Sequence, residues 1–264
     1  MTKDLLFGLP AHDYFASKRL NNSGIKKLLK SPLHFRTSLI EKEEDTKALI
    51  LGSAIHCAVF ESADFDNRYI SAPEGIDRRT KEGKAIWTDL ESSGKTILTA
   101  TDYQTVTSTS RSVLDHRTAQ KLIRNGHAEL TLFSELEGIE TKCRMDYYLP
   151  GVIIDLKTTE DASPAGFARS VANYGYDIQA AWYLDCCEAA DLNAHTFIFI
   201  VVEKTAPHAV ALYELDIQSI ETGRSKYRRA IEIYKNCIDT GNWPGYSEAI
   251  EMVSLPAWAM KEAA

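Results

Sequence analysis

The sequence predicts an α/β fold in which helices flank a central mixed β-sheet and a mainly helical part comes first. Three features of the pattern predict this fold: helical periodicity with caps over residues 1–126, consecutive β-rich segments between residues 128 and 157, and alternating helices and strands after residue 164. We therefore expect a single domain over residues 1–264. Its helical part should span residues 1–126 and its sheet-containing core residues 127–264.

Helices are expected first along the chain. Asn22 or Ser23 can cap a short helix over residues 24–30, and a second short helix should begin at Pro32. The remaining expectations for this part are a nearly all-apolar helix over 46–61, a basic loop over 72–84 and a long amphipathic helix over 101–125.

The second half should alternate between strands and helices. Strands are expected over 128–136, 141–148, 152–157, 196–203 and 209–215. Helices are expected over 164–174, over 178–190 with Asp177 as the cap, and over 217–239. This order predicts a mixed sheet covered by helices.

The segment from Asp146 to Lys157 should form a β-hairpin that brings two carboxylates together. Pro150-Gly151 is a turn signal between two β-rich arms. Counting outward from that turn pairs Leu149 with Val152, Tyr148 with Ile153 and Tyr147 with Ile154. The next pair places Asp146 opposite Asp155, where directly opposed Cβ atoms lie about 5 Å apart. Because like charges at that separation repel, the arrangement predicts a cation between them.

Period-2 alternation places Asp155 and Lys157 on the same face of the strand. An Asp-x-Lys triplet alone is most often an exposed ion pair worth about 0–1 kcal/mol. The apolar neighbours Ile153, Ile154 and Leu156 instead indicate a buried strand, where charged groups need partners. The residues therefore predict a divalent-metal site with a lysine beside it.

Composition narrows the class of protein. Residues are 44% hydrophobic and 25% charged, no 18-residue apolar run is present, and the start lacks the pattern of a signal peptide, so we expect a cytoplasmic protein with no membrane partner. The five cysteines include no Cys-x-x-Cys pair, which argues against a disulfide framework and a zinc ribbon. We expect reduced cysteines in the core.

The net charge of −7 disfavours a general attraction to nucleic acid. Basic residues nevertheless gather locally and could line a groove that contacts DNA. The candidates for DNA binding are Lys26, Lys27, Arg36, Arg78 and Arg79. Each cluster alone is more often a solvated face.

Two motifs resemble those of a known nuclease fold. A hydrophobic strand ends in Asp155-Leu-Lys-Thr158, and Gln179-Ala-Ala-Trp-Tyr183 follows on a helix. Together they resemble the PD-(D/E)xK nuclease fold, in the branch that is similar to the RecB nuclease domain and lambda exonuclease. Residues 22–32, 51–56 and 203–207 further resemble the C-terminal nuclease domain of RecE-type exonucleases (exonuclease VIII).

The resemblance implies roles for several residues. Asp146 and Asp155, with the Leu156 carbonyl, would hold Mg²⁺, for which Mn²⁺ would substitute, and Lys157 would act on the attacking water and the developing charge. On sequence alone His56 is more often a satisfied core residue, but the resemblance makes it a further metal ligand. Gln179 and Tyr183 share one helix face, where ordinary packing is the alternative to a catalytic role beside the metal. Glu140 and Arg144 are weaker candidates.

Two classes of function follow. The first is a metal-dependent exonuclease that degrades linear double-stranded DNA from 5′ to 3′ and leaves 3′ tails for recombination and repair by a RecT-like annealing partner. The RecE resemblance also implies a homo-oligomeric ring of four subunits. Within enzymes, the alternative is a single-strand-specific RecB-like nuclease. The second class is a non-catalytic DNA-binding module on the same fold, and the intact set of Asp146, Asp155 and Lys157 argues against it.

Overall fold

The computed structural model describes residues 4–41 and 46–256. The strands in these ranges are β1 (Asp4–Leu6), β2 (Tyr69–Ser71), β3 (Thr96–Leu98), β4 (His127–Leu136), β5 (Ile139–Leu149), β6 (Gly151–Thr159), β7 (Ala194–Glu203) and β8 (Val210–Glu214). The helices are α1 (Ala11–Ala16), α2 (Asn22–Lys30), α3 (Pro32–Ser38), α4 (Lys47–Phe60), α5 (Ser62–Arg68), α6 (Lys81–Ser92), α7 (Ala100–Asp115), α8 (Arg117–Leu122), α9 (Pro164–Tyr174), α10 (Tyr176–Ala189) and α11 (Ile217–Thr240).

Six strands form the central sheet in the order β1-β4-β5-β6-β7-β8. Strand β6 pairs with β7 in parallel, and the other neighbours pair antiparallel, so the predicted mixed sheet is confirmed. The parallel crossover from β6 to β7 carries α9 and α10, as a parallel connection requires. Strands β2 and β3 form a separate parallel pair.

Helices cover both faces of the sheet and bury two apolar clusters. On one face α10 packs against β4, β5 and β7, with α11 and α2 behind it, and Trp182, Phe197 and Phe199 fill the space between. On the other face α4 and α7 enclose Ile55 and Ile154 with other apolar side chains. Alternate residues of β6 and β7 enter opposite clusters, as period 2 predicts.

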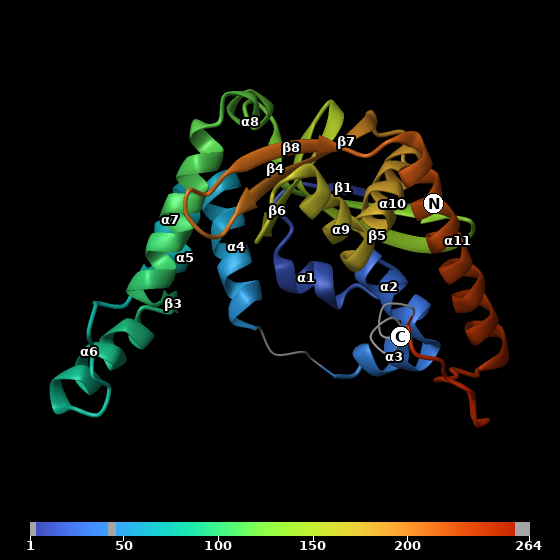
Figure 1. Cartoon of the computed structure of the whole chain (residues 1–264), viewed down its shortest axis with the longest axis horizontal. Helices are drawn as coiled ribbons and strands as arrows, with labels where there is room; N and C mark the ends of the chain where they lie inside the picture. Colours follow the sequence, from blue (N-terminus) through green and yellow to red (C-terminus); the bar gives the residue numbers. More distant parts are fainter. Residues whose placement is uncertain (1–3, 42–45, 257–264) are drawn as a thin grey trace, which may run out of the picture.

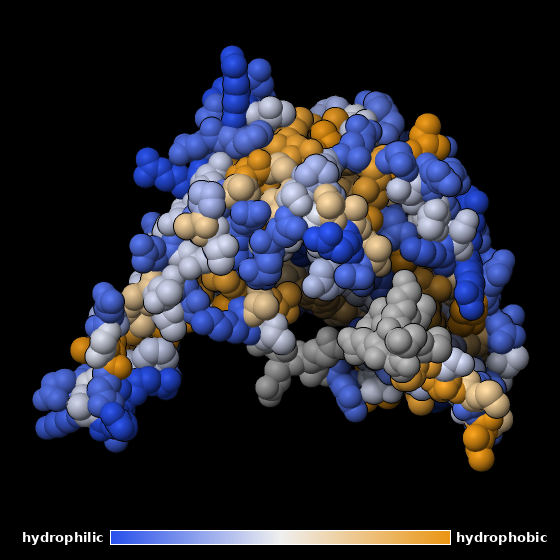
Figure 2. All heavy atoms as spheres, in the orientation of Figure 1, coloured by the Kyte–Doolittle hydropathy of each residue, from blue (hydrophilic) through white to orange (hydrophobic). Residues whose placement is uncertain are grey.

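The molecule has the shape of an arch (Figure 1). The central sheet and its helices form the top, α7 descends on one side toward α6, and α11 descends on the other. Helix α1 lies inside the arch, below the sheet. Figure 2 shows that hydrophilic side chains cover most of the arm that ends in α6 and that this face is hollowed below the sheet.

Most of the predicted elements are confirmed, including the helix over 164–174 and the strands of the core. The long helix expected over 101–125 is wrong, because the chain leaves the helical conformation at His116, whose side chain then caps α8. Asp177 is not a cap, since α10 begins directly after Gly175. A helix begins at Lys81, inside the expected basic loop. Helices α1 and α5 and strands β1 to β3 were not predicted.

All five cysteines are free and buried. Among the helices of the described ranges, none combines the length and the apolarity that crossing a membrane requires.

Candidate metal centre

The site lies where strands β5 and β6 separate. The predicted pairs Leu149–Val152, Tyr148–Ile153 and Tyr147–Ile154 are confirmed, and the ladder then stops. The predicted pairing of Asp146 with Asp155 is therefore not part of the ladder.

Strand β6 instead pairs with its parallel neighbour β7 along its whole length, from Gly151 to Thr159. One side chain crosses the split: the carboxylate of Asp146 accepts the main-chain N–H of Leu156 at 2.9 Å. The split leaves room for polar side chains between two strands that are otherwise buried.

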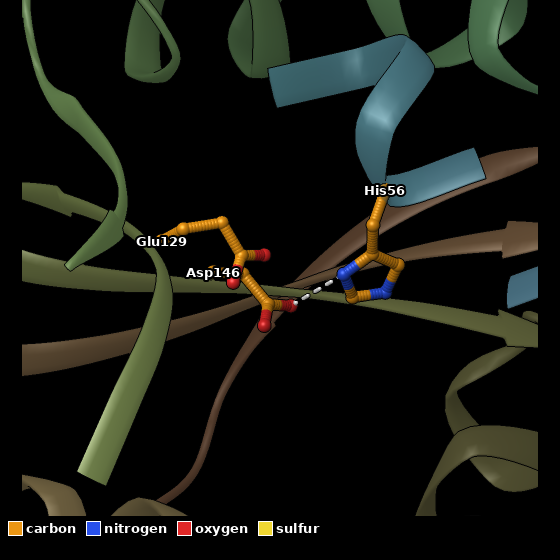
Figure 3. Close-up of side chains that lie close together, drawn as sticks. All are labelled: His56, Glu129 and Asp146. Carbon is orange, nitrogen blue, oxygen red and sulfur yellow. Dashed lines mark ion pairs between the residues drawn. The ribbon is translucent and has the colours of Figure 1, made fainter. Parts of the chain in front are cut away.

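Three side chains converge at this split (Figure 3). His56 comes from α4, Glu129 from β4 and Asp146 from β5, and one ligand atom of each lies within 4.8 Å of the others. Nδ1 of His56 is 3.1 Å from Oδ2 of Asp146. Nitrogen and oxygen donors at these separations suit a divalent cation. Among the described residues, the group whose ligand atoms all lie within 4.8 Å of one another does not include Asp155.

The hydrogen bonds of His56 show that the group needs a positive charge. Its Nε2 lies 2.9 Å from the Leu156 carbonyl oxygen, so Nε2 must carry the proton and donate. Burial lowers the pKa of His56, which favours the neutral ring. Nδ1 then presents a lone pair to the Asp146 carboxylate. Two acceptors at 3.1 Å require a proton or a cation between them.

Asp146 has a strongly raised pKa. Burial is the main cause, and repulsion from Asp155 and Glu129 adds to it, while Lys157 and the Leu156 N–H act in the opposite direction. Without a cation, Asp146 therefore keeps its proton to higher pH than an ordinary aspartate. A divalent ion would displace that proton.

Asp155 and Lys157 form the other half of the site. The Lys157 ammonium lies 2.5 Å from Asp155 Oδ2, and the Asp155 side chain is almost completely buried. Burial alone would lower the pKa of Lys157, but attraction to Asp155 and Asp146 outweighs it and raises the pKa. The lysine is therefore charged at neutral pH. It also lies 4.7 Å from the centre of the Tyr176 ring.

Helix α10 supplies Gln179, whose amide donates a short hydrogen bond to Asp155. Tyr183, one turn later, packs edge-to-face on Phe197 within the core, and burial raises its pKa well above the usual value. The structure thus brings Gln179 to the site. The ring contact of Tyr183 with Phe197 is core packing, which is the alternative to a catalytic role.

Glu129 is the member of the group that the sequence reasoning missed. Its φ of 51° lies in the left-handed region, which is rare for a residue inside a strand. Its carboxylate receives Nε–H of Arg144 at 2.5 Å, so the weaker candidate Arg144 also belongs to the site. Counting from the β4–β5 turn, as was done for the next hairpin, would have placed Glu129 opposite Asp146. Glu140 instead forms a long ion pair with Arg19 away from this group.

The five predicted DNA-binding residues are separated in space. Lys26 lies at the site: its ammonium donates to the Tyr174 carbonyl at 3.2 Å, and burial, with repulsion from Lys157, lowers its pKa. Lys27 lies on the same helix, and Arg36 on α3. Arg78 stacks on Trp87 of α6, and Arg79 pairs with Asp77 just before α6 begins.

A cavity of about 260 Å³ opens beside the catalytic-lysine candidate. Its lining combines cations, carboxylates and aromatic rings, including Lys157, Glu160, Arg169, Tyr174 and Lys204. The cavity therefore extends the polar surface of the split toward α9 and the end of β6.

Known proteins share this architecture. Residues 21–256 match the family described as a PDDEXK-like domain of unknown function (DUF3799). Because this match spans most of the chain, the chain belongs to that family, and its fold is of the PD-(D/E)xK nuclease class. Among curated proteins, no sequence matches the chain.

A solved structure shares the fold. A protein of Eubacterium rectale named as a candidate exonuclease is similar over 98% of this chain and 99% of its own, with 16% identity and a TM-score of 0.66. A phage-related exonuclease from Haemophilus somnus aligns over 85% of this chain and 96% of its own at 15% identity, but its TM-score of 0.34 carries no argument. At these identities the likeness shows the fold alone. The narrower resemblance to RecE-type exonucleases stays a prediction.

Proposed function

We propose that the chain is a divalent-metal-dependent exodeoxyribonuclease that acts on the ends of linear double-stranded DNA. The observation that carries this proposal is the split between β5 and β6, where a buried lysine stands beside two carboxylates and an imidazole–carboxylate pair that needs a proton or a cation between its members. An ordinary structural ion pair would not need the second group. The PD-(D/E)xK fold of the family supports the same chemistry.

His56, Glu129 and Asp146 would hold the metal, with Asp155 at the edge of the group. The donor set is hard apart from one imidazole, which fits Mg²⁺ and also Mn²⁺. When bound, a divalent ion lowers the pKa of a bound water and neutralises charge on the phosphoryl oxygens.

The protein's own side chains supply the other contributions to catalysis. The Lys157 ammonium donates to the attacking water or to a phosphoryl oxygen, where it stabilises negative charge that grows in the transition state. Gln179 fixes the Asp155 carboxylate through its amide and so orients the partner of Lys157. His56 stays neutral and keeps Nε2–H on the Leu156 carbonyl, which aims Nδ1 at the metal position. The Leu156 carbonyl thus acts here as the anchor of His56.

The finer parts of the proposal rest on the RecE resemblance. We infer 5′ to 3′ digestion that leaves 3′ tails for a RecT-like annealing protein in recombination, and a homo-oligomeric ring. One domain carries the activity, because residues 1–126 supply His56 and Lys26 while residues 127–264 supply the carboxylates and Lys157.

One experiment tests the proposal directly. End-labelled linear duplex, single-stranded DNA and covalently closed circular duplex are incubated with the protein and Mg²⁺ or EDTA. We expect mononucleotide release from linear duplex with Mg²⁺ only, with label at the 5′ end released first. Cleavage of the closed circle would indicate an endonuclease, preference for single strands would indicate the RecB-like alternative, and binding without cleavage would leave a DNA-binding module.

A further inference from the structure

The N-terminal segment fills the open end of the split between β5 and β6. Beyond Tyr147 the edge of β5 has no β6 partner, and the main chain at Leu20 occupies it instead. The Leu20 N–H donates to the Glu140 carbonyl at 3.0 Å, and the Lys142 N–H donates to the Leu20 carbonyl at 2.8 Å. Helix α1, just before this contact, is therefore held at the mouth of the split.

A buried lysine fixes the end of α1 at Tyr14 and Ser17, the two residues that flank Phe15 and Ala16. The Lys142 side chain is 3% exposed, and its ammonium donates to the carbonyls of Tyr14 at 2.7 Å and Ser17 at 2.8 Å. The same ammonium lies 4.6 Å from the centre of the Tyr14 ring, which is itself buried. Burying an ammonium is costly unless it is fully bonded. Here the bonds that it makes immobilise the main chain around Phe15.

Phe15 remains 72% exposed in spite of this anchoring. Its ring makes a T-shaped contact with the Tyr14 ring, at 5.3 Å between centroids and 77°, so this neighbour covers at most one face of the Phe15 ring. Most exposed apolar side chains are single and need no explanation. This one differs because a buried polar network holds it in place.

Phe15 is also connected to the metal centre. The Tyr14 ring lies 5.8 Å from the Arg144 guanidinium, and Arg144 holds Glu129. Figure 1 places α1 inside the arch, below the sheet. A DNA strand that reaches the split from inside the arch would pass α1.

Resting on the proposed function, we propose that Phe15 is a stacking platform for an unpaired base of the DNA strand that enters the site. The occupant is a base and not an apolar protein surface, because the neighbours of Phe15 on the short helix, His12 and Asp13, are polar and exposed. A single aromatic face among polar groups suits a nucleobase, and stacking accepts every base.

The test measures binding without cleavage. A single-stranded oligonucleotide with one 2-aminopurine, moved along successive positions from the 5′ end, is titrated with protein in Ca²⁺ without Mg²⁺. We expect the fluorescence to be quenched at one position with the wild type, because stacking quenches 2-aminopurine. Phe15→Ala should remove this quenching and weaken binding about tenfold, as expected for loss of one stacked base.

Two variants make the result specific. Phe15→Trp keeps an aromatic face and should retain both the quenching and the affinity. Ile217→Ala removes an apolar side chain that is 83% exposed at the start of α11 and should change neither. Thermal unfolding of all three variants should match the wild type, since both positions are exposed.

The outcomes separate this inference from the proposed function. Equal affinity and equal quenching for the wild type and Phe15→Ala would overturn the stacking platform, whatever the nuclease assay shows. If the wild type cleaves no DNA with Mg²⁺ yet loses base quenching in Phe15→Ala, the exonuclease proposal fails and the stacking contact stands.

Discussion

The two carboxylates of the split, Asp146 and Asp155, lie close together but in opposite electrostatic situations. Asp155 faces the Lys157 ammonium and the Gln179 amide, so its negative charge is compensated within the protein. Asp146 faces the lone pair of His56 and lies within 4.8 Å of Glu129, and burial raises its pKa. The half with Asp155, here called the complete half, contains its own cation, whereas the half with Asp146, the incomplete half, keeps a proton that an incoming cation would displace. An incoming cation therefore gains more binding free energy beside Asp146 than beside Asp155.

The largest effect on the cleavage rate should come from the complete half, which contains Lys157. Lys157→Ala should lower single-turnover cleavage about 100-fold or more, because the ammonium acts chiefly on the transition state. Duplex binding in Ca²⁺ should stay within about threefold. Quenched-flow cleavage and a gel-shift titration measure the two quantities. A variant that binds poorly but cleaves bound DNA at the parental rate would reverse the assignment.

The incomplete half should control metal binding. Mg²⁺ should raise the thermal midpoint of the wild type, since it binds only the folded state, and a concentration of 100 Kd stabilises by about 2.7 kcal/mol. Asp146→Asn should abolish this response, and His56→Ala should raise the Mg²⁺ concentration for half-maximal stabilisation about tenfold. Thermal melts across a Mg²⁺ series give both values. If His56→Ala follows the parental curve, His56 is a core residue.

Arg144 should have a smaller influence on the same half. It holds Glu129 through one ion pair, so Arg144→Gln should raise the Mg²⁺ concentration for half-maximal stabilisation several-fold while leaving Lys157-dependent chemistry at saturating Mg²⁺ intact. In a Glu129→Gln background, which already lacks this metal ligand, Arg144→Gln should cause no further change. Arg19→Gln, which removes an exposed pair with Glu140, is the matched control and should behave as the parent.

The smallest effect concerns pH. Because the pKa of Asp146 is raised in the metal-free fold, the folded state binds more protons than the unfolded chain between the ordinary aspartate pKa and the raised one. Metal-free stability should therefore fall as pH rises through that window. Mg²⁺ binds the ionised carboxylate, so the gain in thermal midpoint from Mg²⁺ should grow with pH. Asp146→Asn should lose both trends in melts recorded from pH 5 to pH 8.

Local sequence rules predicted the complete half better than the incomplete one. Period 2 places Asp155 and Lys157 on one face, and turn chemistry set the first three pairs of the hairpin. The end of the ladder at Tyr147 could not be predicted from the hairpin alone, because β6 also pairs along its length with β7, whose residues lie about 40 positions further along the chain.

Three further features of the backbone could not be predicted from the sequence, and each has a physical reason. The left-handed backbone at Glu129 is imposed by the surrounding fold and has no residue signature, since glutamate seldom adopts it. The break at His116 lacks proline or glycine. Helix α1 has only 6 residues, too few for a periodic signal, and its position depends on Lys142 more than 100 residues away.

The metal centre also has a consequence for folding kinetics. His56 and Asp146 are 90 positions apart, so the group forms only after the helical part has docked on the sheet, a late event for such distant contacts. When a binding site has not yet formed in the folding transition state, its ligand slows unfolding and leaves the folding rate unchanged. Mg²⁺ should therefore lower the unfolding rate of this protein, and this effect should appear in the unfolding limb of a denaturant chevron.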